Sequence, residues 1–222
     1  MKDCDRPLEK SRLIVFDTEL TGLNPRRDEI VSIGAIMVEN LRIIPDQSFY
    51  SIIRPEGIGK ASTATFIHRI TPENLTDAPP LKDVLNKFLK FCGNSILVGH
   101  QLQIDRPFIL RACKQVAGYP MTNAFVDTIQ LARLCRTKLF QSESNMPHKD
   151  TSYNLGFLAR RLGLPLFRSH DALGDALQTS YLLLKLLCLL KTEGISTCRE
   201  LCVLGSPTWF QSCRYRWGMK SD

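Results

Sequence analysis

The chain has 222 residues and a mass of 25.2 kDa, which suits one large domain or one domain with short appendages. Its hydrophobic fraction of 44% is typical of a globular protein and excludes a disordered or fibrous one. The net charge of +7 favours a polyanionic partner. No apolar run approaches the roughly 20 residues that span a bilayer, and the charged N-terminus lacks a signal-peptide core. We expect a cytoplasmic protein with no membrane association.

The eight cysteines form no recognisable disulfide or metal-binding pattern. Their spacings are unpaired and several lie inside apolar helical patterns, so we interpret them as reduced thiols. The alternative is a zinc site at Cys198, Cys202 and Cys213. Their spacing is unusual for zinc and no histidine lies nearby. The sequence therefore does not favour thiol or zinc chemistry.

The first part of the chain predicts consecutive strands. Apolar patterns typical of strands occur at residues 13–19, 29–38 and 41–53. Glu39-Asn40 predicts a hairpin turn between the second and third strands. Pro45 is expected to interrupt the third strand, because proline cannot donate a ladder hydrogen bond. These features predict an antiparallel meander.

The second part of the chain alternates strands with helices. Short apolar runs predict two buried strands, at residues 95–98 and 125–128. Apolar spacing and turn signals predict helices at residues 79–92, 104–117, 128–135, 153–162, 171–190 and 196–203. Residues 71–73 predict the start of a short helical turn. This order predicts an α/β fold with a mixed five-stranded sheet flanked by helices. We expect a flexible lead-in at residues 1–11, the main domain at 12–192 and a short tail at 193–222.

The first predicted strand ends in acids where a buried strand should remain apolar. Asp17 and Glu19 are two residues apart, so both side chains point to the same face of an extended chain. Two carboxylates at the edge of a core repel each other unless a cation lies between them. Hard oxygen ligands suit Mg²⁺ or Mn²⁺. The alternative is a strand that simply ends in a polar turn.

Two later segments also place acids at the edge of the core. Asp105 falls in the first turn of a helix that follows a strand, where an acid otherwise compensates the helix dipole. At the start of the last long helix, Ser169 or His170 is expected at the cap and Asp175 on the helix. A histidine on a loop suits a base that moves, and an acid on a helix suits a fixed ligand. The alternative for the histidine is an ordinary surface residue.

Together these segments resemble the three motifs of the DEDDh, or DnaQ-like, 3′→5′ exonucleases, a family that includes the proofreading epsilon subunit of bacterial replicative polymerase. The first motif matches at residues 16–23, the second at 99–105 and the third at 170–175, with the HxAxxD pattern. Residues 67–75 resemble the H-G-I-T segment of the family. The resemblance covers residues 12–190, and the motifs in this order and at these separations are highly specific.

The chain departs from the family pattern at four positions. Leu20 stands where the family usually has threonine, Gln101 where it has asparagine, Ile104 where it has an aromatic residue, and Arg69 where it has glycine. The five catalytic positions of the family pattern are all retained, as Asp17, Glu19, Asp105, His170 and Asp175. The departures therefore affect details of the site and leave the chemistry in place.

The resemblance implies a ribonuclease-H-like fold and two-metal hydrolysis of a phosphodiester from a 3′ end. A phosphodiester is anionic, so two cations are needed to neutralise it and to stabilise the attacking and leaving oxygens. In the family pattern, the divalent ions, Mg²⁺ or Mn²⁺, are held by Asp17, Glu19, Asp105 and Asp175. Asp17 would bridge both ions. His170 would be the general base, a role that suits the pKa range of histidine.

Further residues of the motifs are candidates for contacts with the substrate. These candidates are Thr18, Leu20, Leu23, His68, His100 and Gln101. The two leucines would pack against the terminal bases; the alternative for them is ordinary packing. Asp127, which ends another strand, is interpreted as structural support and not as a metal ligand.

The sequence therefore predicts a metal-dependent 3′→5′ exonuclease that acts on single-stranded or frayed DNA and releases nucleoside 5′-monophosphates. Proofreading or repair would be its setting, and a DNA polymerase subunit is a candidate partner. A 3′→5′ exoribonuclease is the alternative, because only contacts to a 2′-hydroxyl would distinguish the two. An alternative of another class is a non-catalytic module that binds nucleic acid or tethers a polymerase.

Overall fold

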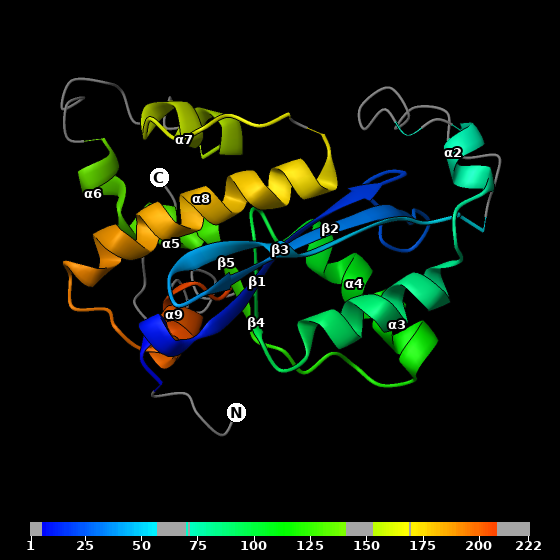
Figure 1. The fold of residues 1–222 in the computed structure, drawn as a ribbon, viewed down its shortest axis with the longest axis horizontal. Coiled ribbons are helices and arrows are strands. Elements are labelled where there is room, and N and C mark those ends of the chain that lie inside the picture. The colour runs from blue at the N-terminus through cyan, green and yellow to red at the C-terminus, as the bar shows by residue number, and fades with distance from the viewer. Residues whose placement is uncertain (1–5, 57–69, 71, 141–152, 169, 208–222) are drawn as a thin grey trace, which may run out of the picture.

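A computed structural model describes residues 6–56, 70, 72–140, 153–168 and 170–207. Within these residues a five-stranded sheet carries helices on both faces (Figure 1). The strands are β1 (Arg12–Leu20), β2 (Ile30–Glu39), β3 (Arg42–Ile52), β4 (Ile96–Gly99) and β5 (Phe125–Asp127). Their order is β3-β2-β1-β4-β5; β1 to β3 are antiparallel, whereas β4 is parallel to β1 and β5 to β4. The predicted mixed sheet is confirmed.

The meander is formed by local turn chemistry. Asn40 and Leu41 both have positive φ, 51° and 56°, which is the conformation of a two-residue hairpin turn that matches strand twist. The turn therefore lies one residue later than predicted. Met37 pairs with Ile44, whereas its neighbour Ile36 pairs with Ser48. The intervening segment of β3, residues 45–47, lacks partners on β2, as predicted from Pro45.

The helices follow the predicted order. They are η1 (Leu8–Lys10), α2 (Pro72–Thr76), α3 (Leu81–Cys92), α4 (Asp105–Ala117), α5 (Thr128–Leu134), α6 (Arg136–Leu139), α7 (Leu155–Arg161), α8 (Ala172–Lys191) and α9 (Cys198–Leu204). Helix α7 begins two residues later than predicted because Asn154 is its N-cap and accepts a hydrogen bond from the Phe157 amide. The short helices η1 and α6 were not predicted.

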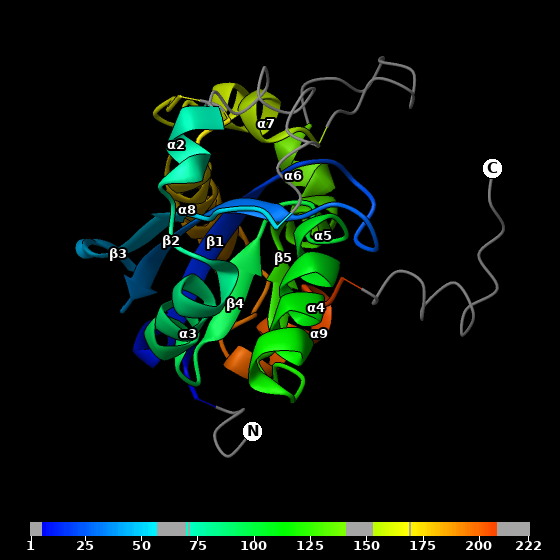
Figure 2. The same ribbon diagram turned by 90° about the vertical axis from the view of Figure 1, so that its right-hand side faces the viewer.

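The sheet separates two hydrophobic cores, because alternate residues of β1 face opposite sides. Val15 packs with Val98 and Leu186 in the core beneath α5, α7, α8 and α9. Phe16 packs with Phe88 and Phe108 in the core beneath α3 and α4. Figures 1 and 2 show α8 on one side of the sheet and α3 on the other. Burial on both faces explains why the central strands are apolar almost throughout.

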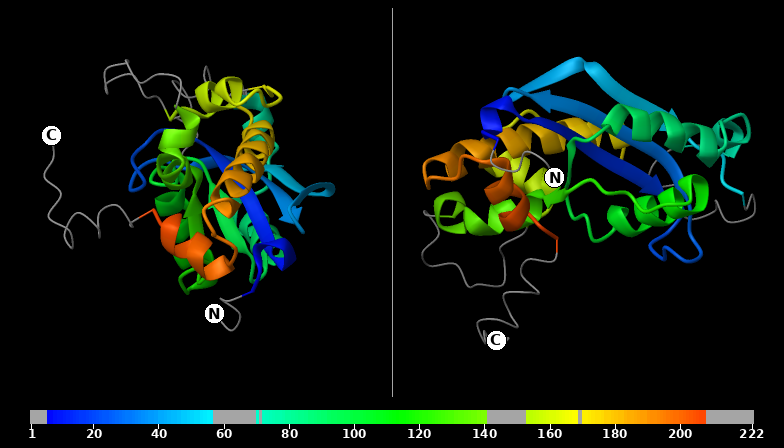
Figure 3. Two further views of the ribbon diagram at one scale, coloured as in Figure 1. Left: turned by 90° about the vertical axis from the view of Figure 1, so that its left-hand side faces the viewer. Right: turned by 90° about the horizontal axis from the view of Figure 1, so that it is seen from below.

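Segments near both ends of the chain pack on the core that contains α8. The Leu8 amide donates to the Ser196 carbonyl at 2.8 Å, and the Leu8 side chain is buried. Leu201 of α9 is also buried, and the Gly205 carbonyl accepts from the Asp127 amide at 2.7 Å. Figure 3 shows η1 beside α9. The start of β1 and the end of β5 are therefore both supported by residues that follow α8.

Among the described residues, α8 is the one helix that is long and apolar enough to cross a membrane, with a mean hydropathy of 1.4. We expected no helix of this kind from the sequence, because polar residues interrupt its apolar run. Half of the apolar window is buried, and its buried leucines pack in the core described above. This is the position of a core helix within a folded domain.

Gly34 of β2 allows the N-terminal end of α8 to approach the sheet closely. A Cβ atom at Gly34 would overlap the backbone of Ala172 and Leu173. Backbone cannot move aside as a flexible side chain can, so any side chain here forces α8 away from β2. Gly34 pairs directly with Asp17 of β1. The distance between β1 and the first turn of α8 therefore depends on this glycine.

We predict that Gly34→Ala lowers the free energy of unfolding by about 1–3 kcal/mol, the usual cost of overpacking a core. Chemical denaturation followed by circular dichroism measures the change. Gly156→Ala on α7 is the matched control, since its Cβ would have only ordinary contacts, the nearest at 3.5 Å. Equal stability of Gly34→Ala and wild type would contradict the close approach.

Candidate active site

The end of β1 and the first turn of α8 bring three carboxylates together. Asp17, Glu19 and Asp175 each offer an oxygen, and these oxygens lie within 4.8 Å of one another. Asp17 and Glu19 share a face of β1 because they are two residues apart. Asp175 is held against them because α8 packs closely over β2 at Gly34. The three carboxylates can bind one hard cation.

Asp105 joins this cluster from the other side of β1. It is the first residue of α4 and is buried, and its Oδ1 accepts a hydrogen bond from the Thr18 hydroxyl. Thr18 lies between Asp17 and Glu19 and faces the opposite side of the strand. Burial raises the pKa of Asp105 to about 6, although the Thr18 hydrogen bond opposes the shift. The four predicted acids thus surround the end of one strand.

The electrostatics of the cluster favour a bound cation. Burial is the largest cause that raises the pKa of Asp17 well above its usual value, and every charged group that adds to the shift is another carboxylate. Burial, followed by repulsion from Asp175 and Asp105, raises the pKa of Glu19 to about 8. Burial also raises the pKa of Asp175. Carboxylates that resist ionisation together fit divalent ions such as Mg²⁺ or Mn²⁺.

His170 lies at the edge of the same cluster. Its backbone has a positive φ of 63°, which is uncommon outside glycine, and its amide donates to Asp175 Oδ2 at 2.9 Å. The side chain is exposed, as a mobile base would be. The cap of α8 is Asp171 and not Ser169 or His170, because the Asp171 carboxylate accepts from the Leu173 amide; Ser169 lies outside the described residues.

A cleft of about 500 Å³ opens beside the carboxylates. It is lined by Glu19, Ser32, Tyr50, Ile52, Ile70, Asn74, Arg168, His170, Asp171, Ala172 and Leu173. The cleft residues from β2 and β3 were not predicted from the sequence. Ser32 was detectable as a polar residue within an apolar strand, and it is fully buried opposite Glu19. No feature of the sequence marks Tyr50 as a cleft residue, because its position there follows only from the register between β2 and β3.

The predicted substrate contacts in the first motif differ in exposure. The side chain of Leu23 is 75% exposed, which leaves it available to a ligand. Leu20 is half-buried and packs against the core beneath α3 and α4. The hydroxyl of Thr18 is already donated to Asp105. Contact of all three with a substrate remains a prediction.

The predicted contacts in the second motif also have different environments. Both ring nitrogens of His100 have protein partners, Nδ1 with the Thr128 hydroxyl and Nε2 with the Tyr153 carbonyl, each at 2.8 Å. Burial lowers the pKa of His100 to about 4, so the ring is neutral at pH 7 and Nε2 donates to the carbonyl. Gln101 is exposed, with a φ of 62°. His68 lies outside the described residues.

Asp127 supports the second motif from beneath. Its carboxylate accepts hydrogen bonds from the amides of Gln101 and Leu102, both at 3.0 Å, and of Ile129 at 2.9 Å. It therefore caps α5 and holds the left-handed turn at Gln101 at the same time. Because its oxygens are used in this way, the geometry agrees with structural support and not with metal ligation.

We predict that binding of Mn²⁺ at pH 7 releases about one proton or more per protein molecule. With a pKa of about 8, Glu19 is mostly protonated at pH 7 in the metal-free protein, whereas a metal ligand must be ionised. Release should fall as the pH rises above 8, where Glu19 is already ionised. Calorimetric titration in buffers of different ionisation enthalpy measures the protons. Glu19→Gln should release fewer; a binding enthalpy that is the same in every buffer would refute the prediction.

The sequence matches the profile of the exonuclease (RNase T) family over residues 14–183. It is 30% identical over 200 residues to DNA polymerase III PolC-type of Staphylococcus haemolyticus, and 32% identical over 198 residues to that of Thermotoga petrophila. These alignments cover 90% and 89% of the chain, but only 13% of each relative.

Solved structures of exonucleases share the fold. Exonuclease X, in complex with 5′-overhanging duplex DNA, aligns with a TM-score of 0.64 and 23% identity over 87% of this chain and 99% of its own. Exonuclease I of E. coli, in complex with a dT13 oligonucleotide, aligns with a TM-score of 0.64 and 17% identity over 83% and 42%. The match of the family profile to most of the chain shows that this protein belongs to the exonuclease family, as its three motifs predicted.

Proposed function

We propose that the chain is a metal-dependent 3′→5′ exonuclease that hydrolyses single-stranded or frayed DNA and releases nucleoside 5′-monophosphates. The observation that carries the proposal is the convergence of Asp17, Glu19 and Asp175 beside a cleft that His170 lines. Carboxylates, a histidine and an open cleft are the parts that metal-assisted phosphodiester hydrolysis needs. Membership of the exonuclease family supports this reaction.

Two divalent ions, Mg²⁺ or Mn²⁺, are the proposed cofactors. When bound, they would neutralise the phosphodiester, lower the pKa of a water molecule and stabilise the leaving oxygen. Asp17, Glu19 and Asp175 would hold one ion, while Asp105 would serve the other and Asp17 would bridge both. The Thr18 hydroxyl fixes the orientation of the Asp105 carboxylate, which would serve a metal-bound water or an ion.

His170 is the proposed general base. It would take a proton from the attacking water, a role for which neutral imidazole is suited near pH 7. Its backbone amide holds Asp175 at 2.9 Å, so movement of the His170 loop is coupled to a proposed metal ligand. The exposed side chain can approach the water once the substrate is in place.

DNA is the proposed substrate because the relatives are DNA polymerases and structural neighbours were solved with DNA. The chain spans only 13% of those polymerases, so association with a polymerase, in proofreading or repair, is a proposal of its own. A cytoplasmic location also stays a prediction.

Digestion of a 5′-labelled single-stranded DNA and of the matching RNA, with Mg²⁺, Mn²⁺ or EDTA, tests the proposal. We expect a ladder that shortens from the 3′ end, is abolished by EDTA, and forms faster on DNA. A faster ladder on RNA would favour the exoribonuclease. Tight binding without any ladder would favour the non-catalytic module.

We predict that His170→Ala lowers turnover about 10²- to 10⁴-fold, the usual contribution of general acid–base catalysis, while Mn²⁺ and single strands still bind. Single-turnover digestion measures the rate, and calorimetry measures the metal. Asp17→Asn is the contrasting variant and should lose both activity and tight metal binding. Turnover of His170→Ala within a few-fold of wild type would remove the histidine from the role of base.

A further inference from the structure

Two described segments, which contain α5, α6 and α7, have no acidic side chains. Residues 128–140 and 153–168 contain six arginines and lysines and no aspartate or glutamate. The six are Arg133, Arg136, Lys138, Arg160, Arg161 and Arg168. Lys138 pairs with Glu193, on a different segment. Five of the six lie on α5, α6 and α7, whereas the net charge of the whole chain is +7.

Within these segments, cations and aromatic rings form a continuous group. The Arg133 guanidinium lies 5.6 Å from the centroid of the Tyr153 ring. The Tyr153 ring packs edge-on to Phe140, with 6.1 Å between centroids. The Arg161 guanidinium lies 4.6 Å from the centroid of Phe140. We call these four residues the cation–aromatic cluster.

The cluster is held in place and is accessible. Arg161 Nε donates to the Leu139 carbonyl at 2.7 Å, which fixes its guanidinium against Phe140. The Arg133 side chain is exposed, and the Tyr153 and Phe140 rings are half-buried. Nucleobases stack on aromatic rings and on guanidinium planes, and arginines also pair with phosphates. The cluster offers both kinds of contact to a single strand.

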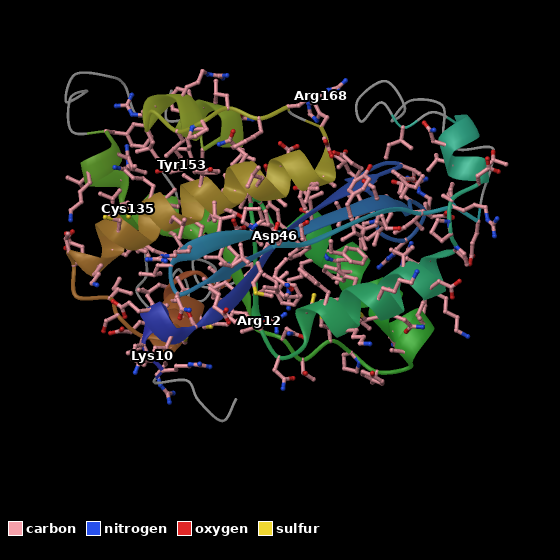
Figure 4. All side chains as sticks on the ribbon, in the orientation of Figure 1. Lys10, Arg12, Asp46, Cys135, Tyr153 and Arg168 are labelled. Atoms are coloured by element: carbon pink, nitrogen blue, oxygen red, sulfur yellow. The ribbon has the colours of Figure 1, made fainter. Side chains whose placement is uncertain are left out.

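The cluster is connected to the candidate active site. His100 Nε2 donates to the Tyr153 carbonyl at 2.8 Å, and the next residue, Gln101, belongs to the turn that leads to Asp105. Figure 4 shows Tyr153 between α7 and α8. Arg168 lies on the same side of α8, near the N-terminal end of that helix. Tyr153 is therefore adjacent to the second motif, which leads to Asp105.

We propose that the cation–aromatic cluster binds the part of a single-stranded nucleic acid that lies upstream of its reacting 3′ end. The proposal rests on the proposed function and adds a second contact region outside the cleft. The aromatic rings between the cations favour a nucleic acid over an acidic protein as the partner. Bases can stack on the rings, and an acidic protein has no bases.

The test compares strands of different length. Anisotropy in EDTA, which prevents hydrolysis, gives the affinity of wild type, Arg133→Gln and Tyr153→Leu for a labelled strand of about 16 nucleotides and for one of about 4. We expect both variants to lower the ratio of the long-strand affinity to the short-strand affinity about tenfold. For the long strand, Arg133→Gln should also reduce the slope of log affinity against log salt concentration by about 0.7, the contribution of one phosphate contact. Lys87→Gln, an exposed position on α3 beyond the opposite face of the sheet, is the matched control.

The outcomes separate this proposal from the proposed function. An unchanged affinity ratio in both cluster variants, or an equal change in Lys87→Gln, overturns the cluster even if the protein degrades DNA. A lowered ratio in a protein that hydrolyses no strand supports the cluster and refutes the exonuclease. Thermal unfolding checks each variant. If Tyr153→Leu does not fold, the exposed Arg133→Gln decides the question alone.

Discussion

Repulsion among carboxylates gathered around the end of β1 is the constraint on which the rest of the site depends. Burial raises the pKa of all four of these acids, and repulsion from the other members of the group adds to the shift at Asp17 and Glu19. Such an arrangement opposes folding unless protons or cations neutralise it. The fold therefore has to hold the acids together by other means until a metal binds. The packing around β1 supplies these means.

Each acid is positioned by a contact that does not itself need a metal. Gly34 lets α8 approach β2 and so brings Asp175 to the strand that carries Asp17. Thr18 holds Asp105 through a hydrogen bond from the other face of the same strand. Asp127 holds the turn before α4 through backbone amides. These contacts preorganise the four carboxylates, which would reduce the cost of ordering them when a metal binds.

Much of this arrangement could be predicted from the sequence because it is local. The alternation of β1 places Asp17 and Glu19 on one face, and the apolar spacing of α8 predicts a helix that carries Asp175. The remaining contacts depend on which segments meet. The sequence shows Gly34 as a small residue in a strand, but only the packed structure shows α8 above it. It shows His100 as a candidate for the substrate, whereas the fold gives both ring nitrogens to Thr128 and Tyr153.

The loop after β1 extends the same logic to the exposed part of the site. Arg111 of α4 donates to the carbonyls of Pro25 and Asp28, and the Thr21 and Glu29 backbones are also hydrogen-bonded. A loop fixed at several points can hold Leu23 in solvent at 75% exposure without letting it fold back onto the core. Displaying a leucine in this way leaves apolar surface in water, and the proposed contact of Leu23 with a terminal base would cover it. The hydrogen bonds of this loop and the contacts around the carboxylates thus act in the same way: both position groups of the proposed site before any ligand binds.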